Sequence, residues 1–302
     1  MEHYMIIRRS QGPATRPAPR YNLPRSGVPD SLLVIAAMIA MHLGSVMAKQ
    51  LFSVASPATV AGFRIVLAGA LAMLLWRPAL QVESKALVPI AGLGVALTGM
   101  NLCFYAALER ISLGMAVTID CLGPLALALI ASRRWLDALW VALAGGGVLM
   151  LVDSEGPVSW SGVLFAAASG AGWAAYIVCS AAVGRHTAGN DGLALAMGFS
   201  ALLALPVVLD NDAALLANPI FLAGAAVLAM LSSLVPHAIE LEALRRITPA
   251  VFGVMMSLEP AIAAAIGLLL LGEEMRAAQW LGIGLVVVAS AGAARGLAAA
   301  KE

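Results

Sequence analysis

The chain is a succession of ten apolar stretches separated by short polar breaks. A helix rises ~1.5 Å per residue, so roughly 20 apolar residues are enough to cross the hydrocarbon core of a bilayer. The stretches have about this length and predict an all-α membrane protein with ten transmembrane helices. We place these helices at residues 31–50, 57–76, 86–108, 113–132, 135–153, 160–183, 192–210, 219–241, 250–271 and 277–297.

The composition agrees with a chain embedded in a lipid bilayer. Hydrophobic residues make up 61% of the chain and charged residues 12%, against about 25% charged residues in soluble domains. The net charge of +1 gives no reason to expect a nucleic-acid partner. Cys103, Cys121 and Cys179 fall within predicted helices, where a free Cys behaves as a small apolar residue, so no disulfide framework is expected.

The charges in the loops predict the orientation of the chain, because Lys and Arg in short loops are retained on the cytoplasmic side. Alternate loops carry fourteen Lys and Arg residues on one side and two on the other. The fourteen are Arg8, Arg9, Arg16, Arg20, Arg25, Arg77, Lys85, Arg133, Arg134, Arg185, Arg245, Arg246, Arg295 and Lys301, and the two are Arg110 and Arg276. Both termini are therefore expected in the cytoplasm.

The first 30 residues differ from the rest of the chain. They carry five Arg and five Pro residues and no apolar core. Such a composition predicts a disordered cytoplasmic tail and excludes a cleavable signal peptide.

A shift of 136 residues aligns the predicted helix 113–132 with the predicted helix 250–271. It matches Leu108 with Leu244, Arg110 with Arg246, Ile111 with Ile247 and Pro124 with Pro260. The repeat unit is then five helices, residues 31–153 and 160–297, and an odd unit inverts the second copy in the membrane. Inverted repeats are typical of secondary transporters, whose substrate lies between the halves. The alternative is a chance similarity of helix composition.

Three predicted helices carry a polar face at helical spacing. The faces are Met38, His42, Ser45 and Lys49; Gly94, Thr98, Asn101 and Tyr105; and Ser169, Trp173, Tyr176 and Ser180. The first and third superpose on a shift of 131 residues. We expect these faces to line one shared cavity, the alternative being hydrogen bonds between helices.

Ionisable side chains inside predicted helices mark a candidate site, because a charge at mid-membrane costs at least ~2.5 kcal/mol. Glu259 lies about ten residues into its helix, ~15 Å from either surface. Asp120 and Arg64 each lie about seven residues from the outer boundary, or ~10 Å deep. These two residues either contact substrate or neutralise one another as a structural ion pair.

Other ionisable residues lie nearer the helix ends. Lys49 ends the first helix, where it either joins the site or extends its charged group to the outer interface. His237 and Glu240 are spaced i, i+3 near the inner surface. A metal site would need a second such pair, which the sequence lacks, so neither metal nor cofactor is expected.

Pro124 and Pro260 fall in the middle of two predicted helices. A proline removes the hydrogen bond to the carbonyl four residues earlier, which belongs to Asp120 and to Met256. Inside a protein, such a carbonyl is satisfied by substrate, water or a side chain. We predict a hinge at both prolines, the alternative being a passive kink.

Four segments resemble the EamA-type carriers of the drug/metabolite transporter superfamily. They are GFRIVLAGALAMLL, GMAVTIDCLGPLALALIASRR, GAGWAAYIV and PHAIELEALRRITPAVFGVMMSLEPAIAAAIGLLLLGEE. The resemblance covers about residues 31 to 295 and is strongest to bacterial carriers that export threonine and homoserine. Asp120 stands where those exporters have a longer Glu, and His42 where many EamA-type chains have Trp. The resemblance implies ten helices in two inverted five-helix repeats and efflux of small metabolites across the inner membrane.

We therefore expect a secondary transporter that exports small amino acids such as threonine and homoserine. An amino acid is a zwitterion, so Glu259 and Asp120 are expected to face its ammonium group, and Arg64, with Lys49, its carboxylate. Asn101, Tyr105, Trp173 and Tyr176 are expected to line the pocket.

No phosphate loop for nucleotide hydrolysis is found in the sequence, so the proton gradient is the expected energy source, used by antiport. Glu259, Glu240 and His237 are the candidate proton carriers. The resemblance implies that Glu240 and Glu259 occupy matching motif positions.

Two alternatives stay open. One is a carrier of the same fold that moves drugs or other metabolites. The other is a membrane-embedded enzyme, which would need a nucleophile with a base, a two-His metal motif or paired Asp residues at mid-membrane. None is found in the sequence, so no catalytic residue is expected.

Overall fold

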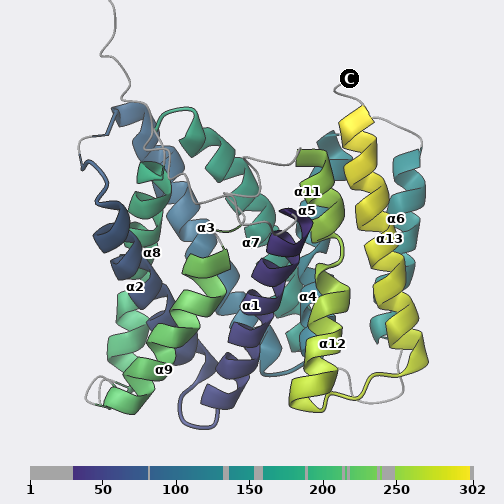
Figure 1. Ribbon diagram of the computed structural model, residues 1–302, viewed down its shortest axis with the longest axis horizontal. Helices are drawn as coiled ribbons and strands as arrows, with labels where there is room; N and C mark the ends of the chain where they lie inside the picture. The colour runs from purple at the N-terminus through teal and green to yellow at the C-terminus, as the bar shows by residue number, and fades with distance from the viewer. Residues whose placement is uncertain are drawn as a thin grey trace, which may run out of the picture.

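The computed structural model describes residues 30–80, 82–131, 136–152, 159–187, 190–212, 215, 218–236, 239 and 249–299. In this part of the chain the long regular elements are all helices (Figure 1). They are α1 (Asp30–Leu51), α2 (Pro57–Trp76), α3 (Ser84–Leu108), α4 (Leu113–Asp120), α5 (Leu122–Ala131), α6 (Leu136–Val152), α7 (Trp160–Gly184), α8 (Asp191–Asp212), α9 (Pro219–Ala229), α11 (Pro249–Met256), α12 (Glu259–Leu271) and α13 (Ala277–Ala299). A π-helical turn, η2 (Met230–Leu234), follows α9 directly.

The lengths and composition of these helices suit a membrane. Within the described residues, seven helices are long and apolar enough to cross one, and three shorter apolar helices cover Leu113–Leu127, Leu139–Leu151 and Pro219–Leu234. The predicted all-helical membrane class is confirmed, and the count of ten spans stays a prediction. Of the 30 residues assigned above to a tail, the structure describes Asp30 alone, which begins α1.

Two predicted helices are divided in the structure. The predicted helix 113–132 becomes α4 and α5, which are separated at Cys121, and the predicted helix 250–271 becomes α11 and α12, separated at Ser257 and Leu258. Each break lies just before a proline, which cannot donate to the carbonyl four residues earlier. The first part of one divided helix, α4, packs against the second part of the other, α12.

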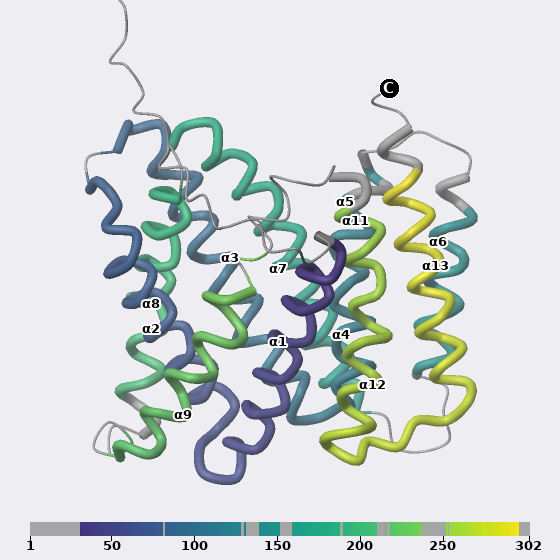
Figure 2. The backbone as a smooth tube through the Cα atoms, viewed as in Figure 1, coloured from purple at the N-terminus to yellow at the C-terminus, as the bar shows by residue number. Residues whose placement is uncertain are grey.

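The other main contacts join α2 to α8, α3 to α7, and α6 to α13. The tube in Figure 2 shows α1 between the group that contains α2, α3 and α8 and the group that contains α6, α12 and α13. The start of α1 and the end of α13 both lie toward the top of this view.

Small residues allow these helices to approach closely, which is how helices associate in a membrane. A Cβ on Gly147 in α6 would lie 2.6 Å from the carbonyl oxygen of Gly282 in α13, and one on Gly282 would lie 2.5 Å from that of Gly147. Large apolar side chains such as Val88, Leu202 and Leu269 are exposed on the outer faces. The polar groups of interest are therefore found within the bundle.

Candidate functional site

The two helix breaks place the two carboxylates that the sequence analysis located inside membrane helices. Asp120 is the last residue of α4, and Glu259 is the first residue of α12. Pro260 lies in the first turn of α12, where a proline is tolerated because its missing N–H needs no partner in the helix. Pro124 lies in the first turn of α5. The structure thus brings each carboxylate to a helix end, and the hinge roles of the prolines stay a prediction.

Glu259 is buried beside His42 of α1. The residue is 2% exposed, and its Oε1 lies 3.8 Å from the Nε2 of His42, which is 1% exposed. Neither ring nitrogen of His42 makes a hydrogen bond to a described residue. A polar side chain buried in this way is costly unless a partner or ligand satisfies it, so this pair is part of the candidate site.

Asp120 is held between α4 and α7. The Ser169 hydroxyl lies within hydrogen-bonding reach of the Asp120 carboxyl and also 3.1 Å from the carbonyl oxygen of Met100. A Cβ on Gly170 would lie 2.5 Å from the carbonyl oxygen of Asp120, so only glycine lets α7 approach the break this closely. The thiol of Cys121 lies within electrostatic reach of the carboxyl groups of both Asp120 and Glu259.

Arg64 does not form the predicted alternative ion pair with Asp120. Its guanidinium donates to the Ser232 carbonyl (2.7 Å), to the Ser233 hydroxyl (3.2 Å) and to the Tyr105 hydroxyl (3.4 Å). The Ser232 carbonyl is available because the residue four positions later is Pro236, which has no N–H to offer. Arg64 therefore links α2 to η2 through a backbone carbonyl and a hydroxyl group.

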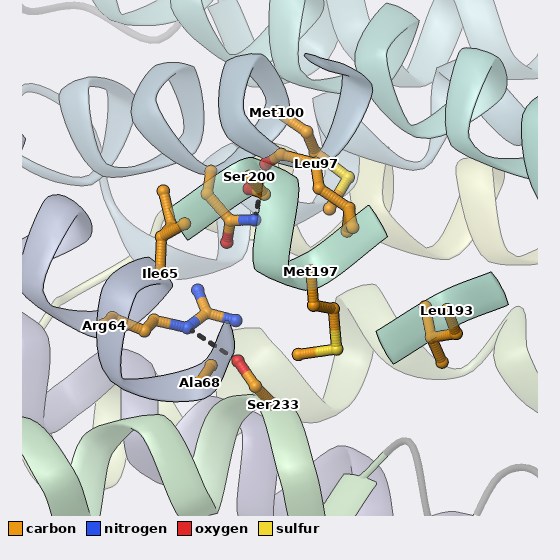
Figure 3. Close-up of a pocket in the computed structure, with 10 residues that line it drawn as sticks. Arg64, Ile65, Ala68, Leu97, Met100, Leu193, Met197, Ser200 and Ser233 are labelled. Atoms are coloured by element: carbon orange, nitrogen blue, oxygen red, sulfur yellow. Dashed lines mark hydrogen bonds between the residues drawn. The ribbon is translucent and has the colours of Figure 1, made fainter. Parts of the chain in front are cut away.

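Arg64 also lines a pocket between the helices. Figure 3 shows its guanidinium, the Ser233 hydroxyl and the side chains of Met197 and Met100 around this space. The pocket is lined by Arg64, Ile65, Ala68, Leu97, Met100, Asn101, Leu193, Met197, Ser200 and Ser233. It combines one cation with small polar groups and apolar walls, which is the composition of a small-molecule site.

The predicted pocket residues divide between this pocket and the core. Asn101 lines the pocket, and its amide donates to the Leu97 carbonyl at 2.7 Å. Tyr105 is fully buried, with the Arg64 guanidinium 5.5 Å from its ring centroid. Trp173 and Tyr176 of α7 are partly buried and pack against two different core clusters. The structure thus joins Arg64, Asn101 and Tyr105 and leaves Trp173 and Tyr176 nearer the packing of α7.

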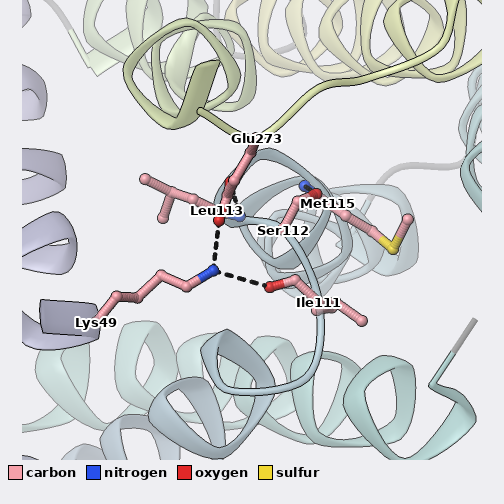
Figure 4. A network of polar contacts seen from close by, with 6 residues as sticks. All are labelled: Lys49, Ile111, Ser112, Leu113, Met115 and Glu273. Carbon is pink, nitrogen blue, oxygen red and sulfur yellow. Dashed lines mark hydrogen bonds and ion pairs between the residues drawn. The ribbon is translucent and has the colours of Figure 1, made fainter. Parts of the chain in front are cut away.

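Lys49 has a partner that the sequence did not predict. Its ammonium group forms an ion pair with Glu273, which follows α12, and lies 3.4 Å from the Ile111 carbonyl. The second Glu273 oxygen accepts from the Leu113 N–H at 2.7 Å. Figure 4 shows that this network ties the end of α1 to the start of α4 and to the segment after α12.

The remaining predicted residues, His237 and Glu240, lie outside the described residues. In the described part of the chain, no group of three or more His, Cys, Asp or Glu side chains is placed to hold a metal ion. Sequence reasoning missed the roles of His42 and Glu273. His42 had a signal, its place on a polar helix face, but its partner is 217 residues away along the chain.

A bundle of apolar helices that holds carboxyl, imidazole and guanidinium groups in its interior is typical of a membrane transporter. Comparison with known families agrees with this class. The model of the EamA-like transporter family matches residues 30–152 and matches again at residues 160–295. The chain belongs to this family, which confirms the resemblance noted in the sequence.

Individual relatives narrow the comparison. The chain is 34% identical to the threonine/homoserine exporter RhtA of Escherichia coli K12 over 266 residues, which cover 86% of this chain and 90% of the relative. It is 33% identical to RhtA of Salmonella typhimurium LT2 over the same share of each chain. It is 26% identical to the uncharacterized transporter YwfM of Bacillus subtilis 168, over 85% of this chain and 90% of that protein.

A solved crystal structure has the same fold. It superposes on 90% of this chain and 98% of its own with a TM-score of 0.58, at 17% sequence identity. The chain is therefore a membrane transporter of the EamA-like family that is similar to amino-acid exporters.

Proposed function

We propose that this protein exports small amino acids such as threonine and homoserine across the inner membrane in exchange for protons. The observation that carries the proposal is its 34% identity to the threonine/homoserine exporter over 86% of the chain. The buried groups support it because they offer opposite charges to a zwitterion.

The binding chemistry rests on Asp120, Glu259 and Arg64. A carboxylate is the natural partner of the substrate ammonium, and the guanidinium of Arg64 is suited to hold the substrate carboxylate with two parallel hydrogen bonds. Met100 connects the two sides, because it lines the Arg64 pocket while its carbonyl accepts from Ser169, the residue beside Asp120. A zwitterion bound near Met100 would therefore have an acid on one side and a cation on the other.

The neighbouring residues would set the size of the site. Asn101 and Tyr105 surround Arg64, and Trp173 and Tyr176 would shape the space for the substrate side chain from α7. Lys49 could contribute only after its ion pair with Glu273 opens. An increase in volume at Asn101 or Trp173 should then change the preference between homoserine and threonine more than it changes folding.

We infer further that ten spans form two inverted five-helix repeats with both termini in the cytoplasm. The packing supports this arrangement: α2 with α8 and α6 with α13 would each pair equivalent helices of the two repeats, and α4 with α12 would join opposite halves of the two equivalent divided helices. The contact of α3 with α7 would correspond to that of α9 with α1. Two such halves exchange roles as the site opens to one side or the other, with the breaks near Pro124 and Pro260 as hinges.

Reporter fusions test this topology. Fusions after Arg77, Arg134, Arg246 and the C-terminus should report the cytoplasm, and those after Glu155 and Asp212 the periplasm. A periplasmic C-terminus would contradict the ten-span arrangement.

The coupling ion follows from the buried carboxylates. A carboxyl group in the middle of the membrane can bind a proton from one side and release it on the other. Glu259 is the first candidate because it is buried in the described structure. Glu240 and His237 are further candidates from the sequence.

Growth and transport measurements test the substrate. Cells that express the protein should tolerate toxic concentrations of homoserine and threonine better than cells that express Glu259→Gln, with lower intracellular pools of both amino acids. A panel of labelled solutes, offered to inverted membrane vesicles, separates this proposal from a carrier of drugs or other metabolites. Uptake of those solutes without uptake of either amino acid would overturn it.

A further inference from the structure

The imidazole of His42 is buried in the middle of α1 without a hydrogen bond to any described residue. The side chain is 1% exposed, and both ring nitrogens, Nδ1 and Nε2, lack such a bond. Ser45, one turn later on the same face of α1, donates its hydroxyl instead to the Met41 carbonyl at 3.3 Å. A buried polar group in this position costs free energy that a bound group can recover. The imidazole is therefore available to a ligand.

The charged group beside His42 decides which kind of ligand group fits there. The Oε1 atom of Glu259 lies 3.8 Å from the Nε2 atom of His42. A second carboxylate at this point would be repelled by Glu259, and a methyl group would leave the ring nitrogens unpaired. A hydroxyl group is uncharged and both donates and accepts, so it pairs with an imidazole nitrogen that carries a proton or lacks one. The chemistry here fits a hydroxyl group.

The spacing of the two side chains fits an amino group and a hydroxyl group on one small molecule. In threonine these groups are on adjacent carbons and lie about 3 Å apart in the gauche arrangement. The ammonium group can then bond to Oε1 of Glu259 while the hydroxyl bonds to Nε2 of His42, two atoms that are 3.8 Å apart. Homoserine reaches a similar spacing when its longer chain folds back. A carboxylate has about four acceptor sites, so other partners of Glu259 leave room for this bond.

Adaptable apolar side chains lie one turn away along the same helix face. Met38 precedes His42 by one turn of α1 and packs with Phe252, Met255 and Met256 of α11. Methionine side chains are unbranched and adjust to different shapes. They could therefore accept either the methyl group of threonine or the longer chain of homoserine, while the imidazole requires the hydroxyl group.

We propose that His42 binds the side-chain hydroxyl group of the transported amino acid and so makes the carrier selective for hydroxy amino acids. This inference rests on the proposed function and assigns the selectivity within it to one residue. Asp120, Glu259 and Arg64 are proposed to hold groups that all amino acids share. His42 is the residue that distinguishes among them.

One compound tests the hydroxyl group directly. Replacing the hydroxyl of either threonine or homoserine by hydrogen gives the same molecule, 2-aminobutyrate. Exchange of labelled threonine in vesicles that hold the full-length protein gives an inhibition constant for each of the three. In wild type, 2-aminobutyrate should inhibit at least ~tenfold more weakly than the two hydroxy amino acids, because it leaves the imidazole unpaired. Equal constants, as expected if a water molecule pairs with His42 throughout, would overturn the inference.

Substitutions at His42 assign this preference to the imidazole. His42→Leu has no polar group, so its preference for threonine over 2-aminobutyrate should fall below ~threefold. His42→Gln keeps a donor and an acceptor and should retain a preference of ~fivefold or more. The control is His186→Leu in the exposed turn after α7, which should match wild type. An unchanged preference in His42→Leu would overturn the inference, and so would loss of exchange of all three compounds in a folded His42→Leu protein.

Thermal unfolding without substrate gives an independent test. If the imidazole has no partner in the substrate-free protein, His42→Leu removes a costly buried polar group and should raise the unfolding temperature by about 2–4 °C. A lower unfolding temperature would show that His42 makes a stabilising contact in the absence of substrate. That result would overturn the inference.

Failure of this inference and failure of the proposed function give different results. Exchange of threonine, homoserine and 2-aminobutyrate without preference contradicts the role of His42 alone. Exchange of none of the three by wild type contradicts the proposed function, and this inference fails with it.

Discussion

Two glutamates, one at each end of α12, have different surroundings. Glu273, just after α12, forms an ion pair with Lys49, accepts from a backbone N–H and is partly open to the outside, with the two side chains 15% and 21% exposed. Glu259, at the start of α12, is buried inside the bundle beside His42. The helix that separates them is 13 residues long.

The difference indicates different tasks for the two contacts. Lys49 forms an ion pair with Glu273, and this link breaks only when the helices separate. A His side chain is charged only when it is protonated, so the contact of His42 with Glu259 is not a permanent ion pair. The first contact is suited to hold one end of the bundle closed, whereas the roles proposed for Glu259 concern proton and substrate.

The largest expected effect is that of Glu259→Gln. Glutamine keeps the size of the side chain but cannot titrate, so the variant should insert normally and lose uphill export driven by a proton gradient, by ~100-fold or more. Exchange of labelled for unlabelled amino acid needs no net proton movement, and its survival would indicate a proton carrier. Loss of both activities with normal folding would indicate substrate binding. Uphill export at the wild-type rate would show that Glu259 is a bystander.

Breaking the contact between Lys49 and Glu273 should have a smaller and different effect. Lys49→Met leaves the Glu273 carboxylate without its cation, at a cost of about 1–3 kcal/mol to the closed state of that end. Export should fall several-fold, because the state that is open on the periplasmic side would then be favoured over the state that is open on the cytoplasmic side. A membrane-impermeant thiol reagent, added on the side predicted to be periplasmic, should modify the buried Cys121 faster than in wild type.

Lys85→Met is the matched control for Lys49→Met. Lys85 lies 3.8 Å from Glu83 on the surface, with the side chains 77% and 58% exposed, and an exposed pair of this kind contributes little. Equal modification rates for Cys121 in Lys49→Met and in wild type would show that the Lys49 contact holds nothing closed.

The class of fold could be read from the sequence because lipid imposes a strong and simple pattern. Backbone groups have no water to bond in a bilayer, so spans must be helical and long. The points at which helices are divided were harder to predict. Pro124 and Pro260 do coincide with divided helices, whereas Pro89 and Pro206 lie inside α3 and α8 without dividing them. A proline marks a freed carbonyl, and neighbouring helices decide whether the chain breaks there.

The partners of the charged residues could not be predicted from their depth. Position along a helix gives the distance from the membrane surface, but not which helix lies opposite. Arg64 and Asp120 have similar depths, yet Arg64 bonds to Ser233, 169 residues away, and Lys49 to Glu273, 224 residues away. One signal for Arg64 was present in the sequence, since Pro236 frees the carbonyl of Ser232. The substrate-binding roles of these residues stay predictions.

A double-mutant cycle tests whether Arg64 and Asp120 stabilise one another as an ion pair. If the two were a structural ion pair, Arg64→Leu and Asp120→Leu would each reduce folded protein, and the double variant would recover much of it. The structure gives Arg64 other partners, so we expect no recovery and an interaction energy below ~0.5 kcal/mol. Folded yield by size-exclusion chromatography, with thermal unfolding of the purified variants, measures this. Recovery of both yield and export in the double variant would remove both residues from the substrate site.

The smallest expected effect is that of Tyr105→Phe. The Tyr105 hydroxyl lies 3.4 Å from the Arg64 guanidinium, near the upper limit for a hydrogen bond, so its loss costs little. The ring that remains still lies 5.5 Å below the guanidinium and keeps the attraction between cation and aromatic face. We therefore expect the apparent affinity for substrate to change by less than ~threefold, while Arg64→Lys, which loses the planar fork, weakens it by at least ~tenfold. Concentration-dependent exchange in vesicles measures both values. Equal losses in the two variants would mean that the hydroxyl, and not the guanidinium geometry, holds the substrate carboxylate.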